Sequence, residues 1–187
     1  MSRVDVISNE RVFDDRHHLH EFQDFWRDGP VALVFLPQFG SAFGLTQARE
    51  LTARFDEVEA LGAQMILIGI GTPIQGFTFR KRSGARAPVM VTADHTLYRT
   101  MGLVTRRRLL NPIRNARAFI NFVRAGIYPY QRTGDPRRLG GVFVVEQGGR
   151  RVTWEHRARY AADLVAGTDV VAALRAIAAR PVTAGAD

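Results

Sequence analysis

Residues 31–44 read VALVFLPQFGSAFG, an apolar run followed by a turn that contains proline and glycine. Six consecutive apolar residues, Val31 to Leu36, are typical of a buried strand. Apolar residues recur at helical spacing from Phe43 to Leu61, so the sequence predicts a long helix directly after the turn. We expect Ser41 to be the N-cap of this helix, with its hydroxyl oxygen accepting hydrogen bonds from N–H groups of the first turn.

Strand and helix signals alternate on both sides of this turn. Before it, we expect a short strand around Val12 and Phe13 and a helix from His18 to Arg27. A capping-box pattern that begins at Thr72 predicts another helix start. The remaining predicted elements are a strand at 63–70, a strand at 89–91, a helical turn at 96–101, a hairpin with strands at 142–146 and 150–154, and a last helix capped by Thr168 that runs to Ala179. This order predicts an α/β fold with a mixed central sheet flanked by helices.

The segment within residues 89–142 is too long for a simple connection between two strands, so we expect it to contribute function or an interface. It contains a predicted amphipathic helix, Asn111–Ala125. The apolar stripe of this helix, which we expect to pack on the sheet, consists of Ile113, Ala116, Ile120, Val123 and Ile127. A neighbouring face carries Arg114, Arg117 and Arg124, and it is either a solvated surface or part of a lid over the Ser41 turn that binds an anionic ligand.

Composition favours one globular domain. The chain has 187 residues, 46% of them hydrophobic, which suits a single domain over residues 1–180 followed by a flexible tail at 181–187. No apolar stretch has the length of a membrane span, and the N-terminal residues lack the apolar block of a signal peptide. We therefore expect a cytoplasmic protein without a transmembrane segment.

Positive charge is concentrated in one part of the chain. The net charge is +8, and residues 99–138 contain ten arginines and a single acid, Asp135, so this segment alone carries +9. Tyr128 and Tyr130 in the same segment could stack on bases. No recognition motif accompanies them, so we do not expect a nucleic-acid partner.

The turn and the predicted elements around it resemble a known family. The motifs that carry the likeness are FLPQFGSAFG at 35–44, LGA at 61–63 before MILIGIG at 65–71, DHTLYRTMGL at 94–103, and LGGVFVV at 139–145 with EHR at 155–157. In order and spacing they resemble the peroxiredoxin-like branch of the alkyl hydroperoxide reductase and thiol-specific antioxidant (AhpC/TSA) superfamily, which implies a thioredoxin-like fold. The resemblance places Ser41 where the family's first cysteine would be, Gly44 where the second would be, and Gly141 in the loop that faces the redox turn.

The resemblance does not carry over peroxide chemistry, because the chain contains no cysteine. Peroxide reduction needs an ionised thiol that becomes a sulfenic acid and is regenerated by another thiol, and a serine hydroxyl performs none of these steps. We therefore expect neither thiol peroxidase nor disulfide oxidoreductase activity. The first remaining function is a binding module for an apolar small molecule, with or without an anionic group, in the cleft beside the turn. The alternatives are a non-redox enzyme (an isomerase, cyclase or hydrolase) acting on a bulky apolar substrate, and a protein-interaction module such as a homodimer.

The candidate site residues follow from these alternatives. Ser41 is the candidate catalytic residue, and we expect Phe119 and Phe122 to face a ligand or a second subunit. The expected substrate-binding residues are Gln38, Phe39, Phe43, Gly44, Tyr98, Arg99, Arg114, Arg117 and Gly141. We expect no cofactor and no metal, since the pair His17 and His20 lacks a clear third ligand.

Overall fold

The structure is a computed structural model that describes residues 3–93, 95–103, 112–130 and 138–179, without the side chains of Pro112 and Arg114. The described residues form a seven-stranded sheet in the order β2-β1-β5-β4-β3-β6-β7. The strands are β1 (Arg11–Asp14), β2 (Leu19–Glu21), β3 (Val31–Phe35), β4 (Gln64–Ile70), β5 (Val89–Thr92), β6 (Gly141–Val145) and β7 (Val152–Arg157). Strand β4 is parallel to β3 and to β5, whereas the other neighbouring pairs are antiparallel, so the sheet is mixed as predicted.

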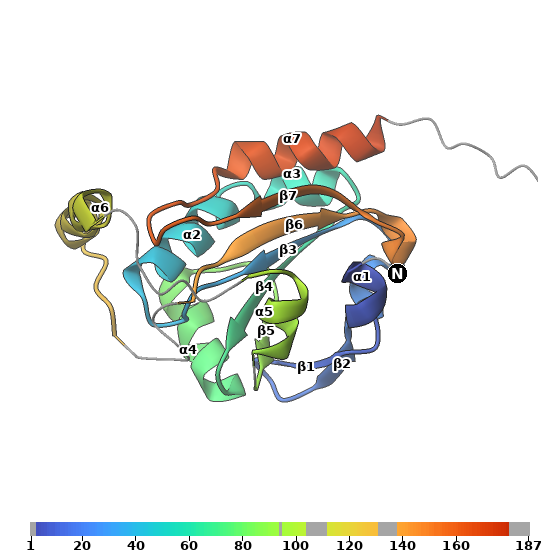
Figure 1. Ribbon diagram of the computed structural model, residues 1–187, viewed down its shortest axis with the longest axis horizontal. Helices are drawn as coiled ribbons and strands as arrows, with labels where there is room; N and C mark the ends of the chain where they lie inside the picture. The colour runs from blue at the N-terminus through green and yellow to red at the C-terminus, as the bar shows by residue number, and fades with distance from the viewer. Residues whose placement is uncertain (1–2, 94, 104–111, 131–137, 180–187) are drawn as a thin grey trace, which may run out of the picture.

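Helices cover both faces of this sheet (Figure 1). They are α1 (Arg3–Ile7), α2 (Ala42–Thr52), α3 (Phe55–Ala60), α4 (Pro73–Ser83), α5 (Thr96–Thr100), α6 (Pro112–Arg124) and α7 (Gly167–Ala178), together with the 3-10 helices η1 (Phe22–Trp26) and η2 (Gln147–Gly149). Buried residues of α2, α3, α4 and α7 pack on one face, and those of α1, α5 and η1 pack on the other. The observed architecture is therefore the predicted α/β fold, a mixed central sheet flanked by helices.

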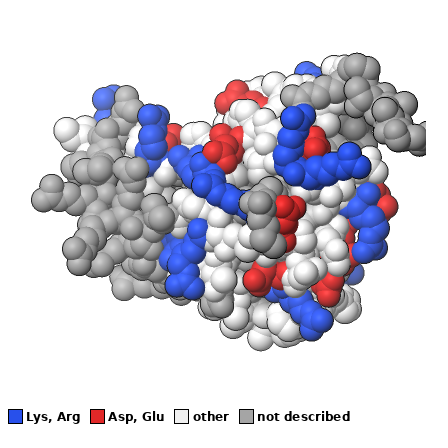
Figure 2. Space-filling view, turned by 45° about the vertical axis from the view of Figure 1, so that its right-hand side comes forward, with Lys and Arg blue, Asp and Glu red and all other residues white. Residues whose placement is uncertain are grey.

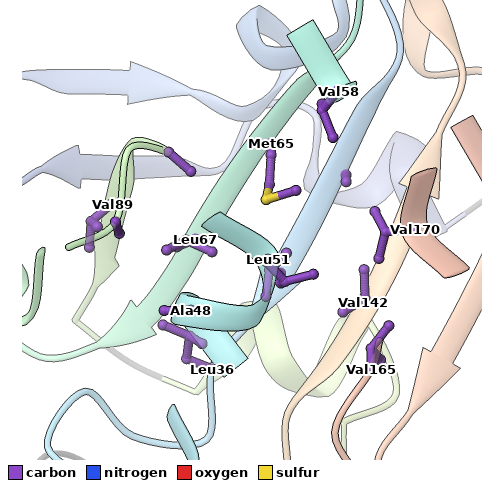
Figure 3. Packing of buried hydrophobic residues seen from close by; sticks show 14 of the residues in the cluster. Leu36, Ala48, Leu51, Val58, Met65, Leu67, Val89, Val142, Val165 and Val170 are labelled. Carbon is purple, nitrogen blue, oxygen red and sulfur yellow. The ribbon is translucent and has the colours of Figure 1, made fainter. Parts of the chain in front are cut away.

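The core forms because apolar residues of the central strands alternate between the two faces of the sheet. On β3, Ala32 and Val34 belong to the cluster under α2 and α7, while Phe35 belongs to the cluster on the opposite face. Figure 3 shows the first of these clusters, in which Leu51 of α2 and Val170 of α7 approach the strands from the same side. Both faces of β3 are thus covered, which places the end of this strand and the turn after it on a rigid support.

The helix predicted from His18 to Arg27 is wrong. His17 adopts a positive φ of 71° in a turn, and the chain then returns as β2, where Leu19 pairs with Phe13 of β1. The helical part is limited to the 3-10 helix η1. The hairpin hydrogen bonds available from β1 therefore outweigh the local helical pattern. The predicted tail at 181–187 and residue 111 of the predicted amphipathic helix lie outside the described residues.

Two further helix predictions are corrected in detail. The long helix predicted from Phe43 to Leu61 is interrupted, and α2 and α3 are separate helices. The last helix begins at Gly167 rather than behind a capping Thr168, and its N-cap Ala166 offers no side-chain acceptor. The backbone N–H of Gly167 instead donates to Oε1 of Glu50, 3.1 Å away. A glutamate that is distant in sequence provides the acceptor, which a local pattern does not reveal.

Helix α6 confirms the predicted amphipathic helix and only part of its predicted packing. Ile113, Ala116 and Ile120 are exposed, whereas Val123 is half-buried and Ile127, just after the helix, is buried in the core. The half-buried side of the helix carries Phe122, whose ring packs edge-on against the ring of Phe43, with centroids 5.1 Å apart. Helix α6 therefore packs against α2 beside the turn, at the edge of the molecule (Figure 1).

Candidate functional site

The turn between β3 and α2 is held in place by the buried ring of Phe39. This ring is fully buried and lies 5.1 Å from the ring of Phe79 on α4. On its other side it covers Gly69 of β4, where any Cβ atom would overlap the ring. Phe39 therefore anchors the turn to the sheet, and its side chain is part of the core rather than of an open site.

Ser41 is the N-cap of α2, as predicted. Its Oγ accepts a hydrogen bond from the backbone N–H of Gly44 at 3.0 Å and donates to the carbonyl oxygen of Gln38 at 3.2 Å. The hydroxyl proton is thus directed toward a carbonyl oxygen, which is not a general base. In this arrangement Ser41 orders the turn and presents a polar group, and it is not activated as a nucleophile.

Gly44 is closely enclosed by the same turn. A Cβ atom at this position would overlap the carbonyl oxygen of Gln38 and would lie 3.2 Å from Oγ of Ser41. The position that the family resemblance gives to a second cysteine is therefore closed to any side chain in this structure. The chain has no cysteine, and the backbone around Gly44 leaves no room for a side chain at one of the two positions that the resemblance gives to cysteines.

A cavity of about 340 Å³ lies beside the turn. It is lined by Pro37, Gln38, Ser41, Phe43, Asn115, Phe119, Arg138 and Ala161. Phe43, Phe119, Pro37 and Ala161 give it an apolar body, whereas the other four side chains are polar or charged. Its volume falls within the range of small-molecule sites, roughly 300 to 1,000 Å³.

Helix α6 forms one wall of this cavity, and two hydrogen bonds help to fix that wall. Asn115 of α6 accepts a hydrogen bond at Oδ1 from the backbone N–H of Ala162, 3.2 Å away. After the helix, the backbone N–H of Tyr130 donates to the carbonyl oxygen of Gly40 at 3.1 Å. Part of the predicted insertion therefore packs directly against the Ser41 turn.

Arg138 contributes a buried positive charge to the cavity wall. The side chain is only 6% exposed, and its Nη1 donates to the carbonyl oxygen of Leu103 at 3.0 Å. Its Nε is buried and has no hydrogen-bond partner among the described residues, and within that part of the chain no carboxylate forms an ion pair with it. A guanidinium stays charged at any physiological pH, and an unpaired buried donor is costly. The guanidinium also lies over the ring of Tyr98, 5.6 Å from the ring centroid, so the cavity wall carries a fixed positive charge.

Tyr98 lies beneath the site rather than in it. Its side chain is fully buried, and its hydroxyl donates to the carbonyl oxygens of Leu36, at 2.7 Å, and Ile68, at 3.0 Å. Burial raises the pKa of Tyr98, and the nearby positive charge of Arg138 only partly opposes this rise. The hydroxyl is neutral at physiological pH and joins the ends of β3 and β4.

The structure brings together only some of the predicted site residues. Gln38, Ser41 and Phe43 line the cavity, and so does Phe119, whereas Phe39, Gly44 and Tyr98 form the packed layer below. Arg99 is exposed and donates to Oγ1 of Thr96, Arg117 is exposed on α6, and the side chain of Arg114 lies outside the described residues.

Gly141 is the first residue of β6 rather than part of the predicted loop, and it lines a small cavity of about 20 Å³ that shares Pro37 and Ala161 with the larger cavity. A Cβ atom there would lie 2.7 Å from the carbonyl oxygen of His156 on β7. The glycine is required by close packing between β6 and its neighbours, so the approach of a ligand is not needed to explain it.

Sequence reasoning missed Pro37, Asn115, Arg138 and Ala161 as lining residues. The signal for Arg138 was available in the strand pairing. Phe35 of β3 pairs with Gly141 of antiparallel β6, so residues that follow Phe35 lie opposite residues that precede Gly141. Gln38 is three residues after Phe35 and Arg138 is three residues before Gly141, so both lie at the same edge of the sheet. Asn115 and Ala161 depend on how α6 docks, which strand pairing does not determine.

Metal ions and membrane spans have no structural support in the part of the chain that the structure describes. Its His, Asp and Glu side chains form no group of three or more that could hold a metal ion. None of its helices has the length and apolar character needed to cross a bilayer.

The sheet order, its helical layers and the turn at the end of β3 define a thioredoxin-like fold. A family model described as AhpC/TSA antioxidant enzyme matches residues 50–160, which is more than half of the chain. The chain therefore belongs to the AhpC/TSA family, and it does so without a cysteine.

Two curated relatives are similar to parts of this chain. The chloroplastic thioredoxin-like protein AAED1 of Arabidopsis thaliana is 26% identical over 102 residues, 54% of this chain and 41% of that protein, so the chain spans less than half of that relative. The prostamide/prostaglandin F synthase of Salmo salar is 28% identical over 138 residues, 71% of this chain and 68% of that protein.

Solved structures share the fold. The bacterioferritin comigratory protein of Xanthomonas campestris superposes with a TM-score of 0.68 at 15% identity, covering 93% of this chain and 95% of that one. Peroxidoxin BcpB of Mycobacterium tuberculosis has a TM-score of 0.64 at 20% identity, with 89% and 92% covered. At these identities the likeness establishes the fold alone.

Proposed function

We propose that this protein binds an apolar small molecule with an anionic group in the cavity beside the Ser41 turn and has no thiol peroxidase activity. The observation that carries the proposal is the cavity of about 340 Å³ with the buried residue Arg138 in its wall. The predictions of a cytoplasmic location, of one domain over residues 1–180 and of a homodimer stay predictions.

The loss of peroxidase activity follows from the chemistry of the reaction. Attack on the O–O bond requires a thiolate, and turnover requires a thiol that reduces the resulting sulfenic acid. The chain has no cysteine, and the hydroxyl of Ser41 is engaged with Gln38 and Gly44. Hydroperoxide should therefore persist in the presence of this protein and any thiol donor.

The chemistry of the ligand follows from the lining. Phe43 and Phe119 contribute aromatic surface that favours an apolar body. Arg138 favours an oxyanion, because a carboxylate or sulfonate can accept charge-assisted hydrogen bonds from a guanidinium. For a ligand of about twenty non-hydrogen atoms, roughly 0.3 kcal/mol per atom predicts a dissociation constant in the tens of micromolar.

A matched pair of fluorescent probes tests this proposal. Anilinonaphthalene sulfonate has an apolar body with a sulfonate, and N-phenylnaphthylamine has the same aromatic body without it. We expect saturable binding of both probes, with Arg138→Met weakening the sulfonate by roughly tenfold and leaving the neutral probe unchanged. Arg117→Met, which removes an exposed arginine outside the cavity, is the charge control.

Two neighbouring residues of α6 distinguish the cavity from the outer surface. Phe119→Ala should weaken both probes, because Phe119 lines the cavity, whereas Ile120→Ala should weaken neither, because Ile120 points outward. Absence of saturable binding, or equal effects of these two substitutions, would contradict the proposal. Arg138→Lys, which keeps the charge, serves if the methionine variant fails to fold.

A non-redox enzyme acting in the same cavity is the second candidate. One relative is named as a prostamide/prostaglandin F synthase, which supports an apolar lipid as substrate class. In that case Ser41 would hold the substrate, and the N–H groups of the first turn of α2 would stabilise a developing negative charge. Ser41→Ala should then abolish turnover with little loss of probe binding, whereas a pure binding module shows no turnover in the wild type.

A further inference from the structure

The outer side of α6 combines exposed apolar residues with arginines. Ile113 is 71% exposed and Ile120 is 50% exposed, and Ala116 lies between them on the same side of the helix. Arg117 and Arg124 are also exposed, and at 100° per residue both fall within about 60° of Ile120. The opposite side, which includes Phe122, packs on the body of the protein.

We propose that this outer side of α6 docks the protein on an anionic lipid surface. A helix with apolar residues on one side, arginines at its margin and no acidic residue is suited to lie in the plane of a bilayer interface. The apolar side chains would enter the acyl boundary, and the guanidinium groups would remain at the level of anionic headgroups.

The charge distribution favours a lipid surface over a second copy of this chain. The thirteen residues of α6 contain three arginines and no Asp or Glu. Figure 2 shows that on the body of the molecule Asp and Glu side chains lie among Lys and Arg side chains, so charge there is mixed. Two copies that meet through α6 would bring like charges together, whereas anionic headgroups neutralise them.

Docking through α6 would also place the cavity near the lipid. Asn115 and Phe119 of this helix line the cavity, and Phe119 is still 42% exposed. The wall of the cavity would therefore lie at the interface, where amphiphilic molecules are concentrated. The docking itself does not depend on which ligand the cavity binds.

Vesicle co-sedimentation of the full-length protein tests the proposal. We expect binding to phosphatidylcholine vesicles that contain roughly one third phosphatidylserine, weak binding to pure phosphatidylcholine, and loss of binding at high salt. Arg117→Gln and Arg124→Gln should each weaken binding about fivefold, since a basic residue near such a surface contributes about that factor. Ile120→Asp should abolish binding.

Ile74→Asp is the matched control, because Ile74 is also an exposed isoleucine, at 68%, and lies on α4. It should leave vesicle binding unchanged, and thermal denaturation should show that both aspartate variants are folded. Equal binding to neutral and anionic vesicles, or equal effects of Ile74→Asp and Ile120→Asp, would overturn the proposal. So would the absence of vesicle binding together with a dimer in analytical ultracentrifugation that Ile120→Asp dissociates.

Discussion

Replacing Ser41 with cysteine gives the most informative single perturbation, because the wild-type chain has no thiol and therefore no background. The variant Ser41→Cys places one sulfur at the N-cap of α2, within reach of the N–H of Gly44 that now donates to Oγ at 3.0 Å. The same residue lines the cavity that Arg138 supplies with positive charge. All three features favour a thiolate over a thiol.

The expected effect can be estimated from these contacts. A helix N-terminus stabilises an anion by about 0.3 to 1 kcal/mol. A hydrogen bond to a charged acceptor contributes about 1.5 to 3 kcal/mol, and partial burial offsets part of this sum. A net value of about 2 kcal/mol corresponds to a thiolate-to-thiol ratio roughly thirtyfold above that of an unperturbed cysteine at the same pH.

The rate of alkylation by iodoacetamide as a function of pH measures this ratio. Thr72→Cys is the matched control, because Thr72 is the exposed N-cap of α4, where its hydroxyl accepts from the N–H of Gln75 at the longer distance of 3.4 Å. We expect Ser41→Cys to ionise at a lower pH than Thr72→Cys. If Ser41→Cys instead ionises at or above the pH of a free cysteine, the account of an electropositive turn is refuted.

Three further substitutions test the packing and the electrostatics of the fold. Gly44→Ala should destabilise the protein by about 1 to 3 kcal/mol in urea unfolding, because the added Cβ would overlap the carbonyl oxygen of Gln38. This strain exceeds the gain in helix propensity. Unchanged stability would mean that the turn can shift. Tyr98→Phe should cost about 1 to 2 kcal/mol in the same assay, since two buried carbonyl oxygens lose their shared donor, and no loss would contradict the hydrogen bonds described. Burial raises the pKa of Asp14, but hydrogen bonds from backbone N–H groups and from two histidine side chains outweigh this effect and lower the pKa to about 2. Because the pKa of Asp14 is lower in the folded than in the unfolded protein, this stabilisation is present above about pH 4 and is lost as the pH falls to about 2. Asp14→Asn should therefore lower the free energy of unfolding by about 1 kcal/mol at neutral pH and reduce its dependence on pH in the acid range. An unchanged pH dependence would contradict this role of Asp14.

The parts of the fold that were predicted correctly depend on short stretches of sequence. The N-caps Ser41 and Thr72 are set by a side chain and an N–H group three residues later. The strands of the central sheet appear as apolar runs because both faces are covered. By contrast, Gly167 at the start of α7 is capped by Glu50 of α2, and only the tertiary fold brings these residues together.

The candidate site was predicted at its turn and at Phe119 of α6. Gln38, Ser41 and Phe43 are close in sequence, and all three line the cavity. Arg138 enters the site through the pairing of β3 with β6, which requires knowledge of the strand register. The docking of α6 was mispredicted because hydrophobic periodicity identifies an apolar side of a helix, and Phe122 and Phe43 instead determine which side meets the body.

The central claim is that the cavity beside the Ser41 turn is a binding site for an amphiphilic anion. A crystal structure of the wild-type protein with bromoundecanoic acid tests it directly, since anomalous scattering locates the bromine atom of the ligand. We predict a carboxylate that accepts hydrogen bonds from the guanidinium of Arg138 and an alkyl chain that lies between Phe43 and Phe119. A cavity filled by protein side chains, or a bromine signal found only at other sites, would contradict it.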